Sequence, residues 1–413
     1  MAARITAGRV ALAAVAACAL GLTAFLTAVR GVQYVGAIGR ANGTLYDFGI
    51  FYRSAVAFWR GTAIYPPGQP NFSPPIAVVL LSPIAGAPAV VAYRVFVAVS
   101  LVVLVAALVW TAVAVHSRTG GAVAGVVALL ATPALAATLG QGQVYALLAA
   151  GLATAWVLDR ADHQRGAGIA LGIVVACKPV LAPVLLWPLV RGRRRELVAA
   201  LVTTAAATLA GAALVGPAQT LRYVRVALGG YPAHDVDNAS LLTTGIRLVT
   251  PGREIPPLVD APGLGWIAGV VVVALLTVTV VRAGRHELGL WALVAASLLA
   301  SPLAWRGYLV VLYPGVIVLL ATARTRLLGA FLVALLLVPH SLPSLWSDRA
   351  STGYITATLL GPLVLLATWA AFTEAASRPG EMAGDQSSSP GARRARGEQR
   401  APVVRGPSAL PDS

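Results

Sequence analysis

The amino-acid sequence predicts an all-α integral membrane protein. Of its 413 residues, 58% are hydrophobic and only 11% are charged, whereas soluble domains carry about a quarter charged residues. Apolar runs of about twenty residues recur along the chain, and each is long enough to cross the hydrocarbon core of a bilayer. Arginines gather in short clusters between these runs, which is typical of loops held on the cytoplasmic side.

The net charge of +16 and the two cysteines bear on which partners and which kinds of site are expected. Because the arginines are divided among loops and a tail, they indicate contact with membrane lipids, and we expect no nucleic-acid partner. Cys18 and Cys177 both lie in apolar segments without paired spacing. They therefore predict neither a disulfide framework nor a metal site.

The first apolar segment runs from Val10 to Val29 and follows Arg4 and Arg9. A cleaved signal peptide is one interpretation of this start. The run is long for a signal sequence, so we favour a retained helix with its N-terminus inside. The loop 30–72 then lies on the outer face of the membrane.

That outer loop contains the stretch around which the rest is organised. Apolar and aromatic residues recur there at helical spacing, namely Phe48, Phe51, Tyr52, Ala55, Phe58 and Trp59. Arg53 and Arg60 fall off this stripe, and Gly61 is a plausible stop. The pattern predicts an amphipathic helix lying in the membrane interface, with the Asp47 carboxylate at its start.

The remaining apolar segments predict the rest of a multi-span bundle. They lie at 75–84, 89–115, 122–139, 144–158, 166–190, 197–215, 264–281, 288–299, 307–323, 327–338 and 354–372. This gives about twelve transmembrane helices, with ten or eleven as the alternative because two segments are short. Because successive spans cross the membrane in opposite directions, this count places Arg191–Arg195 on the cytoplasmic side and the loop 216–263 on the outer side.

Two parts of the chain differ in composition. Residues 1–376 form the membrane domain, and residues 377–413 are rich in Arg, Ser, Gly and Pro. That tail predicts a disordered basic segment on the cytoplasmic side of the plasma membrane, so both termini are expected inside. Gly140-Gln141-Gly142-Gln143 lacks the context of a nucleotide-binding loop, so an ATP-driven machine is not expected.

Asp47 is the first candidate for chemistry, because it is the only acidic residue in the first outer loop. Transfer of a sugar from a lipid phosphate with inversion needs a carboxylate that takes the proton from the acceptor hydroxyl. The alternative is a purely structural helix N-cap. The two roles are compatible, since a helix N-terminus keeps a carboxylate ionised and oriented.

Lys178 is the second candidate, and it is the only lysine among 31 basic residues. It lies inside an apolar segment, where an ionisable group is functional by default. Pro179 opens the helix beside it. We expect Lys178 to contact a lipid-linked phosphate, with an interhelical ion pair or snorkelling to the interface as the alternative.

The outer loops supply further candidates. Asp235, Asp237 and Asn238 suit hydrogen bonding to sugar hydroxyls, and Arg247 suits the donor phosphate, although a solvated loop explains any one of them as well. In the turn 301–308, Arg306 is a candidate phosphate ligand, while Trp305 and Tyr308 also fit interfacial anchors. Acceptor or sugar contacts are also expected from Tyr52, Gln141 and Trp305. His234 beside Asp235 is too little for a metal pair, so we expect neither metal nor cofactor.

These residues resemble glycosyltransferase family 87 of the GT-C superfamily. The resemblance rests on the outer-loop Asp before an amphipathic helix and on segments that follow in the family's order. Those segments are Arg60-Gly61-Thr62-Ala63-Ile64-Tyr65, Phe72-Ser73-Pro74-Pro75, Gly140-Gln141 through Tyr145, Gly168 to Gly172 with Lys178-Pro179, Asn238 to Arg247, and Ser301-Pro302 with Trp305.

The resemblance implies a GT-C-like helical bundle and a polyprenyl-phosphate-mannose-dependent α-(1→2)-mannosyltransferase of actinobacteria. Such enzymes act on phosphatidylinositol mannosides, lipomannan and lipoarabinomannan, and their catalytic Asp corresponds to Asp47. One departure concerns the segment after Trp305, where the family commonly has histidines and this chain reads Arg306-Gly307-Tyr308. No histidine role can therefore be transferred.

The expected function is inverting transfer of a mannosyl residue from polyprenyl-phosphate mannose to a cell-envelope glycolipid or lipoglycan. Asp47 is the expected general base at the outer face. Two alternatives stay open at this point. One is an arabinosyltransferase that uses polyprenyl-phosphate arabinose, and the other is a non-enzymatic flippase or transporter of lipid-linked sugars.

Overall fold

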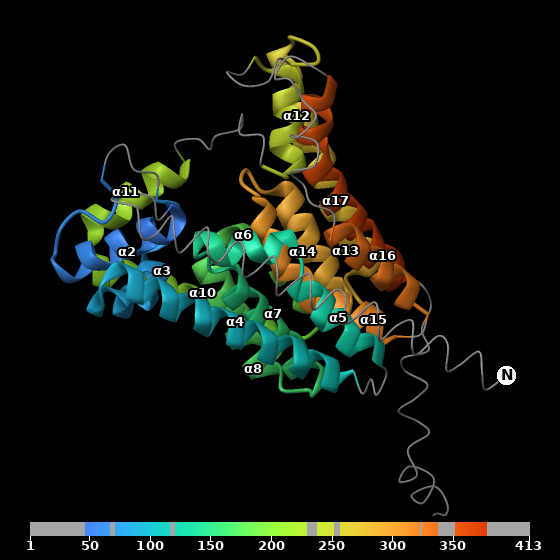
Figure 1. Ribbon diagram of the computed structural model, residues 1–413, viewed down its shortest axis with the longest axis horizontal. Helices are drawn as coiled ribbons and strands as arrows, with labels where there is room; N and C mark the ends of the chain where they lie inside the picture. The colour runs from blue at the N-terminus through green and yellow to red at the C-terminus, as the bar shows by residue number, and fades with distance from the viewer. Residues whose placement is uncertain are drawn as a thin grey trace, which may run out of the picture. The chain divides into compact units, whose positions relative to one another are not determined.

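The computed structural model describes residues 46–66, 71–115, 120–228, 238–251, 257–322, 324–337 and 352–377. Most of these residues are helical and none of them lies in a β-strand, so the all-α prediction is confirmed for this part of the chain (Figure 1). The expected first helix at 10–29 and the tail at 378–413 lie outside the described residues. Contacts within the chain separate residues 1–376 from residues 377–413.

The described helices occur in the following order along the chain. The first group comprises α2 (Tyr46–Trp59), α3 (Pro75–Leu81), the 3₁₀ turn η1 (Ser82–Gly86), α4 (Ala89–Ala114), α5 (Gly120–Leu130), α6 (Pro133–Gln141), α7 (Tyr145–Arg160) and α8 (Gln164–Cys177). Next come η2 (Pro179–Leu185), α9 (Leu186–Val190), α10 (Arg194–Val215), α11 (Pro217–Leu228) and α12 (Leu241–Val249). The last group comprises η3 (Pro262–Leu264), α13 (Trp266–Ala283), α14 (Gly289–Ala300), η4 (Arg306–Leu312), α15 (Tyr313–Ala321), α16 (Arg326–Leu337) and α17 (Thr352–Ser377).

Four helical stretches are long and apolar enough to cross a membrane, by length and composition. They are 89–114, 194–215, 262–283 and 359–377, and α5 with α6 becomes a fifth if that bent pair is one span. A membrane protein with several spans is thus supported, whereas the count of about twelve stays a prediction. Several of the expected segments are shorter helices of 10–17 residues.

Prolines and polar caps explain why apolar segments are divided. The segment 166–190 breaks at Lys178, which has φ −144° and ψ 82° and is followed by Pro179. A residue before proline is disfavoured in the α conformation, so α8 ends there. The segment 122–139 bends by 51° between α5 and α6, where the Thr132 side chain caps α6 by accepting from the Leu135 amide.

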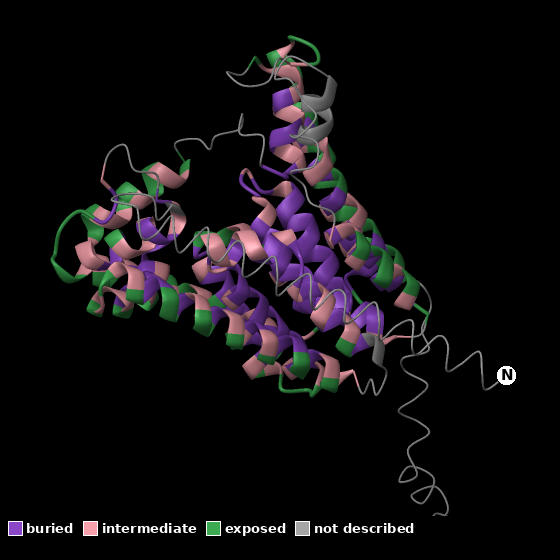
Figure 2. Cartoon of the chain, in the orientation of Figure 1, coloured by how far each residue is buried: buried purple, intermediate pink, exposed green. Residues whose placement is uncertain are grey.

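Burial separates the central helix from the peripheral ones. Residues Gly289 to Leu299 of α14 are all buried, which is expected of a helix that is apolar on every side. In contrast, α10 and α13 expose valines and leucines, among them Val202 and Val273. Figure 2 shows buried residues concentrated around α14 and exposed ones along the outer helices. Exposed apolar helix faces of this kind fit contact with lipid.

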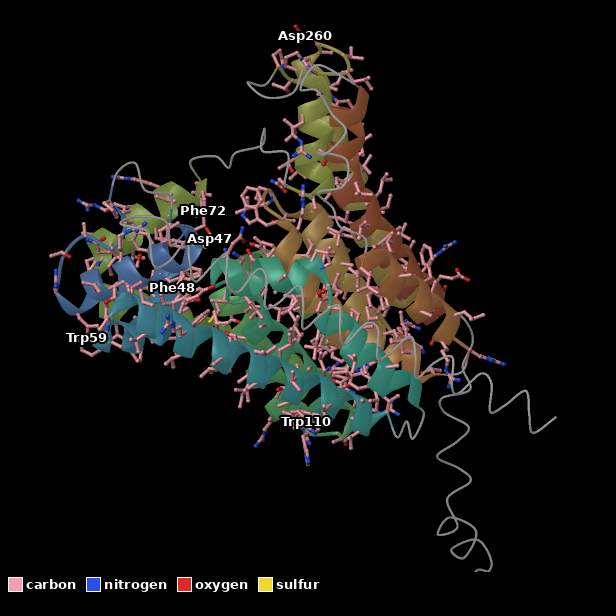
Figure 3. The ribbon with its side chains drawn as sticks, viewed as in Figure 1. Asp47, Phe48, Trp59, Phe72, Trp110 and Asp260 are labelled. Atoms are coloured by element: carbon pink, nitrogen blue, oxygen red, sulfur yellow. The ribbon has the colours of Figure 1, made fainter. Side chains whose placement is uncertain are left out.

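Helix α2 confirms the predicted helix and is fastened by its aromatic residues. Phe48 is buried and packs edge-on against Tyr93 of α4, with ring centroids 5.3 Å apart. The Tyr52 hydroxyl donates to the Ala87 carbonyl over 2.9 Å, and the Trp59 indole donates to the Ser82 carbonyl over 2.9 Å. These contacts fix α2 against η1 and α4, and they orient Asp47, which is labelled beside Phe48 in Figure 3.

Candidate active site

A cavity of about 530 Å³ lies where α2, the ends of α6 and α8, and the turn before η4 meet. Its lining combines charged, amide and aromatic side chains with an apolar floor. The lining residues are Asp47, Ile50, Phe51, Asn71, Phe72, Ser73, Ala77, Leu81, Ala137, Gln141, Gln143, Val144, Tyr145, Cys177, Lys178, Leu303, Trp305, Arg306, Gly307 and Tyr308. Asp47 is the only carboxylate among them. Figure 3 shows Asp47 and Phe72 close together, with Trp110 far along α4.

Asp47 stands in the first turn of α2, where the positive end of the helix favours a carboxylate. Its Oδ2 accepts a hydrogen bond from the Gln143 side-chain amide. Burial raises the pKa of the Asp47 carboxyl above its ordinary value, while the Gln143 hydrogen bond and the Lys178 charge act to lower that pKa. The net result is a carboxylate of raised basicity that faces a cavity.

The α6 terminus places Gln143 against Asp47. Gly142 has φ +65° and ends α6 in the left-handed conformation, which glycine adopts without steric cost. The backbone amide of Gln143 then donates to the Thr138 carbonyl over 2.8 Å. A Cβ atom at Gly142 would lie 2.6 Å from the Cβ of Phe48. Glycine therefore allows both the turn and the close approach of α2.

Lys178 enters the cavity from the break between α8 and η2. Its Nζ lies 4.9 Å from the centroid of the Tyr308 ring and 5.9 Å from that of Tyr145. The two rings are themselves 4.1 Å apart, so they hold the cation through their π faces. Within the described part of the chain, no carboxylate lies within 4.0 Å of Lys178. The predicted alternative of a close interhelical ion pair is therefore not found among these residues.

The turn before η4 brings Trp305 and Arg306 to the same cavity. Gly307 follows them in close contact with α6 and α7, because a Cβ atom there would lie 2.9 Å from both Thr138 Oγ1 and a Tyr145 ring carbon. The Thr138 hydroxyl also donates to the Gly307 carbonyl over 3.2 Å. A bulkier residue does not fit at position 307 unless the Thr138 and Tyr145 side chains move.

Asn238 forms two hydrogen bonds to the turn 301–305. Its amide nitrogen donates to the Pro302 carbonyl over 3.0 Å, and its Oδ1 accepts from the Ala304 amide over 3.0 Å. Arg247 is buried and donates to the Asn238 carbonyl over 2.9 Å. These bonds position Trp305, which forms an isolated antiparallel bridge with Asn238.

The structure brings together five of the residues predicted from sequence: Asp47, Gln141, Lys178, Trp305 and Arg306. Three others lie outside the lining. The Tyr52 hydroxyl donates a hydrogen bond to the Ala87 carbonyl. Asn238 donates to the Pro302 carbonyl, and Arg247 donates to the Asn238 carbonyl. Their contacts are those of packing residues, and their predicted ligand roles gain no support from this placement. Asp235 and Asp237 lie outside the described residues.

Sequence reasoning missed Gln143, Asn71 and Tyr145 as parts of the site. The buried Asn71 amide donates to the Ser54 hydroxyl over 2.7 Å, and its Oδ1 accepts from the Ser73 amide over 2.9 Å. Gln143 and Tyr145 lay in the segment 140–145 that contributes to the family resemblance, but no role in the site was assigned to either. The signal for Gln143 was the Gly-Gln pair directly after a helix, where a left-handed glycine redirects the next side chain.

The site offers a base and two cations to a bound substrate. Among the described residues, no group of three His, Cys, Asp or Glu side chains is placed to hold a metal ion. The chemistry that the lining itself supports is removal of a proton by Asp47 and stabilisation of a leaving anion by Lys178 and Arg306. The aromatic lining suits the faces of a sugar ring.

Comparison with known proteins finds matches among glycosyltransferases. A profile described as glycosyltransferase family 87 matches residues 72–302, more than half of the chain. The chain is also 30% identical over 240 residues to proteins named alpha-(1->3)-arabinofuranosyltransferase from two Mycobacterium tuberculosis strains, CDC 1551 / Oshkosh and H37Rv. The match covers 54% of this chain and 54% of each relative, so the chain spans about half the length of the curated relatives it matches.

Proposed function

Because this chain belongs to glycosyltransferase family 87, we propose that it transfers a sugar from a polyprenyl phosphate to a cell-envelope glycolipid or lipoglycan, with Asp47 as the general base. The observation that carries the proposal is the cavity that Asp47 shares with two cations, Lys178 and Arg306. A flippase needs no carboxylate of raised basicity opposite cations, so this arrangement favours an enzyme over a transporter.

The proposed reaction is a single displacement with inversion. Asp47 takes the proton from an acceptor hydroxyl while that oxygen forms a bond to the anomeric carbon of the donor. The bond between the anomeric carbon and the phosphate oxygen breaks, and its electron pair stays with the polyprenyl phosphate. Asp47 then gives its proton to water. The products are the glycosylated acceptor and a free polyprenyl phosphate.

Lys178 and Arg306 are the proposed partners of the leaving phosphate. Negative charge grows on the phosphate as the bond to the sugar breaks, and fixed cations in a partly buried site stabilise that charge without reorganisation. The Tyr145 and Tyr308 rings hold the Lys178 ammonium in place. Arg306 adds a planar guanidinium that can bind two phosphate oxygens. The active site is proposed to face the extracytoplasmic side of the plasma membrane, with both termini in the cytoplasm.

Two donor sugars are candidates. The resemblance noted from the sequence implies mannose, and the named activity of the relatives favours arabinofuranose. Transfer of either sugar releases the same leaving group, polyprenyl phosphate, so the proposed roles of Lys178 and Arg306 hold for both donors. Since the relatives are matched over about half of their length, their activity enters here as a hypothesis about the donor.

The decisive experiment supplies each radiolabelled donor to purified protein in vesicles with candidate glycolipid acceptors. The wild type is compared with Asp47→Asn and with Asp260→Asn, a control at an exposed carboxylate far from the cavity (Figure 3). We expect transfer from one donor, a loss of about 10²–10⁴-fold in Asp47→Asn, and no change in Asp260→Asn. A folded Asp47→Asn protein with wild-type transfer contradicts the base assignment. Donor that crosses the vesicle membrane without transfer favours the flippase.

A further inference from the structure

A second recess lies on the outer surface of the α8–α10 helix pair. It has a volume of about 520 Å³, and Arg165, Arg194 and Arg195 stand beside an apolar floor. The floor is formed by Ile169, Val198 and Val202, whose exposed fractions are 47%, 58% and 61%. Three guanidinium groups at the end of an apolar groove form an amphipathic site, which we call the arginine groove.

The arginines of this groove differ from their neighbours in what they contact. Arg191 and Arg193 form ion pairs with the buried Asp159, and Arg193 also pairs with Asp162 at 2.5 Å. By contrast, within the part of the chain that the structure describes, no carboxylate lies within 4.0 Å of the arginines in the groove. The fold thus neutralises one set of arginines and leaves three positive charges for an external anion.

A polar hollow adjoins the groove and shares two of its arginines. It has a volume of about 330 Å³ and is lined by residues 162–166 together with Arg195. Asp162 lies on this hollow, but its carboxylate accepts from Gln164 over 3.2 Å and pairs with Arg193, so its charge is balanced. The hollow therefore offers room for a polar headgroup beside the apolar floor.

The arginine groove is separate from the candidate active site. Arg165 stands in the first turn of α8, while Lys178 follows the last residue of that helix. A helix of 14 residues with a rise of about 1.5 Å per residue separates them by roughly 20 Å. The groove also runs along α10, which is long and apolar enough to span a membrane. Its arginine end corresponds to the loop 191–195, which the positive-inside rule places on the cytoplasmic side.

We propose that the arginine groove binds a membrane phospholipid with an anionic headgroup. The phosphate is held by Arg165, Arg194 and Arg195, and one acyl chain lies on Ile169, Val198 and Val202. Arginine binds phosphate oxygens in a bidentate manner, and basic pockets beside membrane helices on the cytoplasmic face recruit anionic lipids. An inorganic phosphate ion would leave the apolar floor unused, which is why the proposal commits to a lipid. It does not depend on the proposed transferase chemistry.

The test is native mass spectrometry of the detergent-purified full chain. The protein receives an equimolar mixture of dioleoyl phosphatidylglycerol and dioleoyl phosphatidylcholine. The charge variant is Arg165→Gln/Arg194→Gln/Arg195→Gln, and its control, Arg53→Gln/Arg222→Gln/Arg225→Gln, removes three exposed arginines outside the groove. A third variant, Val202→Trp, fills the floor and keeps the arginines. Circular dichroism checks that each variant is folded.

We expect the wild type and the control to retain phosphatidylglycerol with about a tenfold preference over phosphatidylcholine, because both keep the three groove arginines that attract the anionic headgroup. The charge variant is expected to lose the preference, and Val202→Trp to lose at least half of the bound lipid. Equal binding of both lipids, or an unchanged preference in the charge variant, overturns the proposal. The proposal is also overturned if inorganic phosphate displaces the lipid and Val202→Trp binds as much lipid as the wild type. Those two results together indicate a site for phosphate alone.

Discussion

At Asp47, burial and polar contacts act in opposite directions on one carboxyl group. Burial raises its pKa, and the Gln143 hydrogen bond and Lys178 lower it. A general base works best when its pKa lies near the working pH, so partial opposition of this kind keeps the group both basic and ionised. The pH dependence of transfer is the direct measure of that balance.

Gln143→Ala tests the hydrogen bond to Asp47. The bond favours the ionised carboxylate, so removing it raises the pKa of Asp47 further. Asp47 must be ionised to accept a proton, and the acid limb of the kcat/KM profile is therefore expected to move to higher pH. Gln141→Ala is the matched control, since Gln141 lines the cavity and is expected to change KM without moving the limb. An unmoved limb in Gln143→Ala contradicts the positioning role.

Lys178→Met tests the cation at the leaving group. The variant keeps the length of the side chain and removes its charge, so we expect kcat/KM for the donor to fall by about 10²–10³-fold. Lys178→Arg retains the charge and is expected to lose less. Arg225→Met, at an exposed position of α11, serves as the control for loss of one positive charge. Steady-state kinetics with labelled donor in vesicles measures all three, and equal rates for Lys178→Met and wild type contradict the assignment.

At the scale of elements, the site depends on one turn. The α6 terminus and the start of α2 meet at Gly142, whose left-handed backbone directs Gln143 toward Asp47 while Phe48 packs over it. Phe48 in turn is packed against Tyr93 and Phe96 of α4. The position of Asp47 against Gln143 is therefore set by the packing of α2, α4 and the end of α6.

Gly142→Ala and Gly61→Ala together separate backbone strain from steric contact. Both glycines have φ near +64°, but only Gly142 has an atom of another residue within 4 Å of an added Cβ. Each alanine is expected to cost about 1–2 kcal/mol of stability for the left-handed conformation. Gly142→Ala must also displace Phe48, so we expect a lower melting temperature and a large loss of transfer, whereas Gly61→Ala retains transfer. Equal activities of the two folded variants contradict the proposed role of this contact.

At the scale of the whole molecule, two polar regions lie at opposite ends of the same helices. α7 begins at Tyr145 in the cavity and ends at Arg160, and α8 begins beside Arg165 and ends before Lys178. The far end carries the ion pairs Arg160–Glu287 and Arg191–Asp159. This arrangement fits a substrate site on one membrane face and a basic face on the other.

Single-cysteine labelling tests the orientation of the molecule. In a Cys18→Ser/Cys177→Ser background, Arg194→Cys and Asp260→Cys each introduce one thiol at an exposed position. The positive-inside rule predicts that an impermeant maleimide labels intact cells at Asp260→Cys and labels Arg194→Cys only after lysis. The reverse pattern places the cavity on the cytoplasmic side and contradicts extracytoplasmic transfer. Labelling of both variants in denaturant controls for expression.

Composition and residue pattern alone predict a helical membrane protein and several residues of the candidate site. Composition and arginine distribution indicate a helical membrane protein, and the isolated Asp47 and the single Lys178 draw attention because charged groups are costly in apolar segments. Polar residues in the outer loops looked equally suitable, yet Asn238 and Arg247 are used to fasten the turn that carries Trp305.

Which of these candidate residues line one cavity depends on how the helices pack. Asp47 and Gln143 are 96 positions apart, and no periodicity within a helix reports a contact between α2 and the end of α6. The break at Pro179 was predicted from sequence, whereas the bend between α5 and α6 was not, because a capping Thr divides a segment without changing its hydropathy. Long-range packing sets both the shape of the cavity and the division of arginines between ion pairs and the open groove.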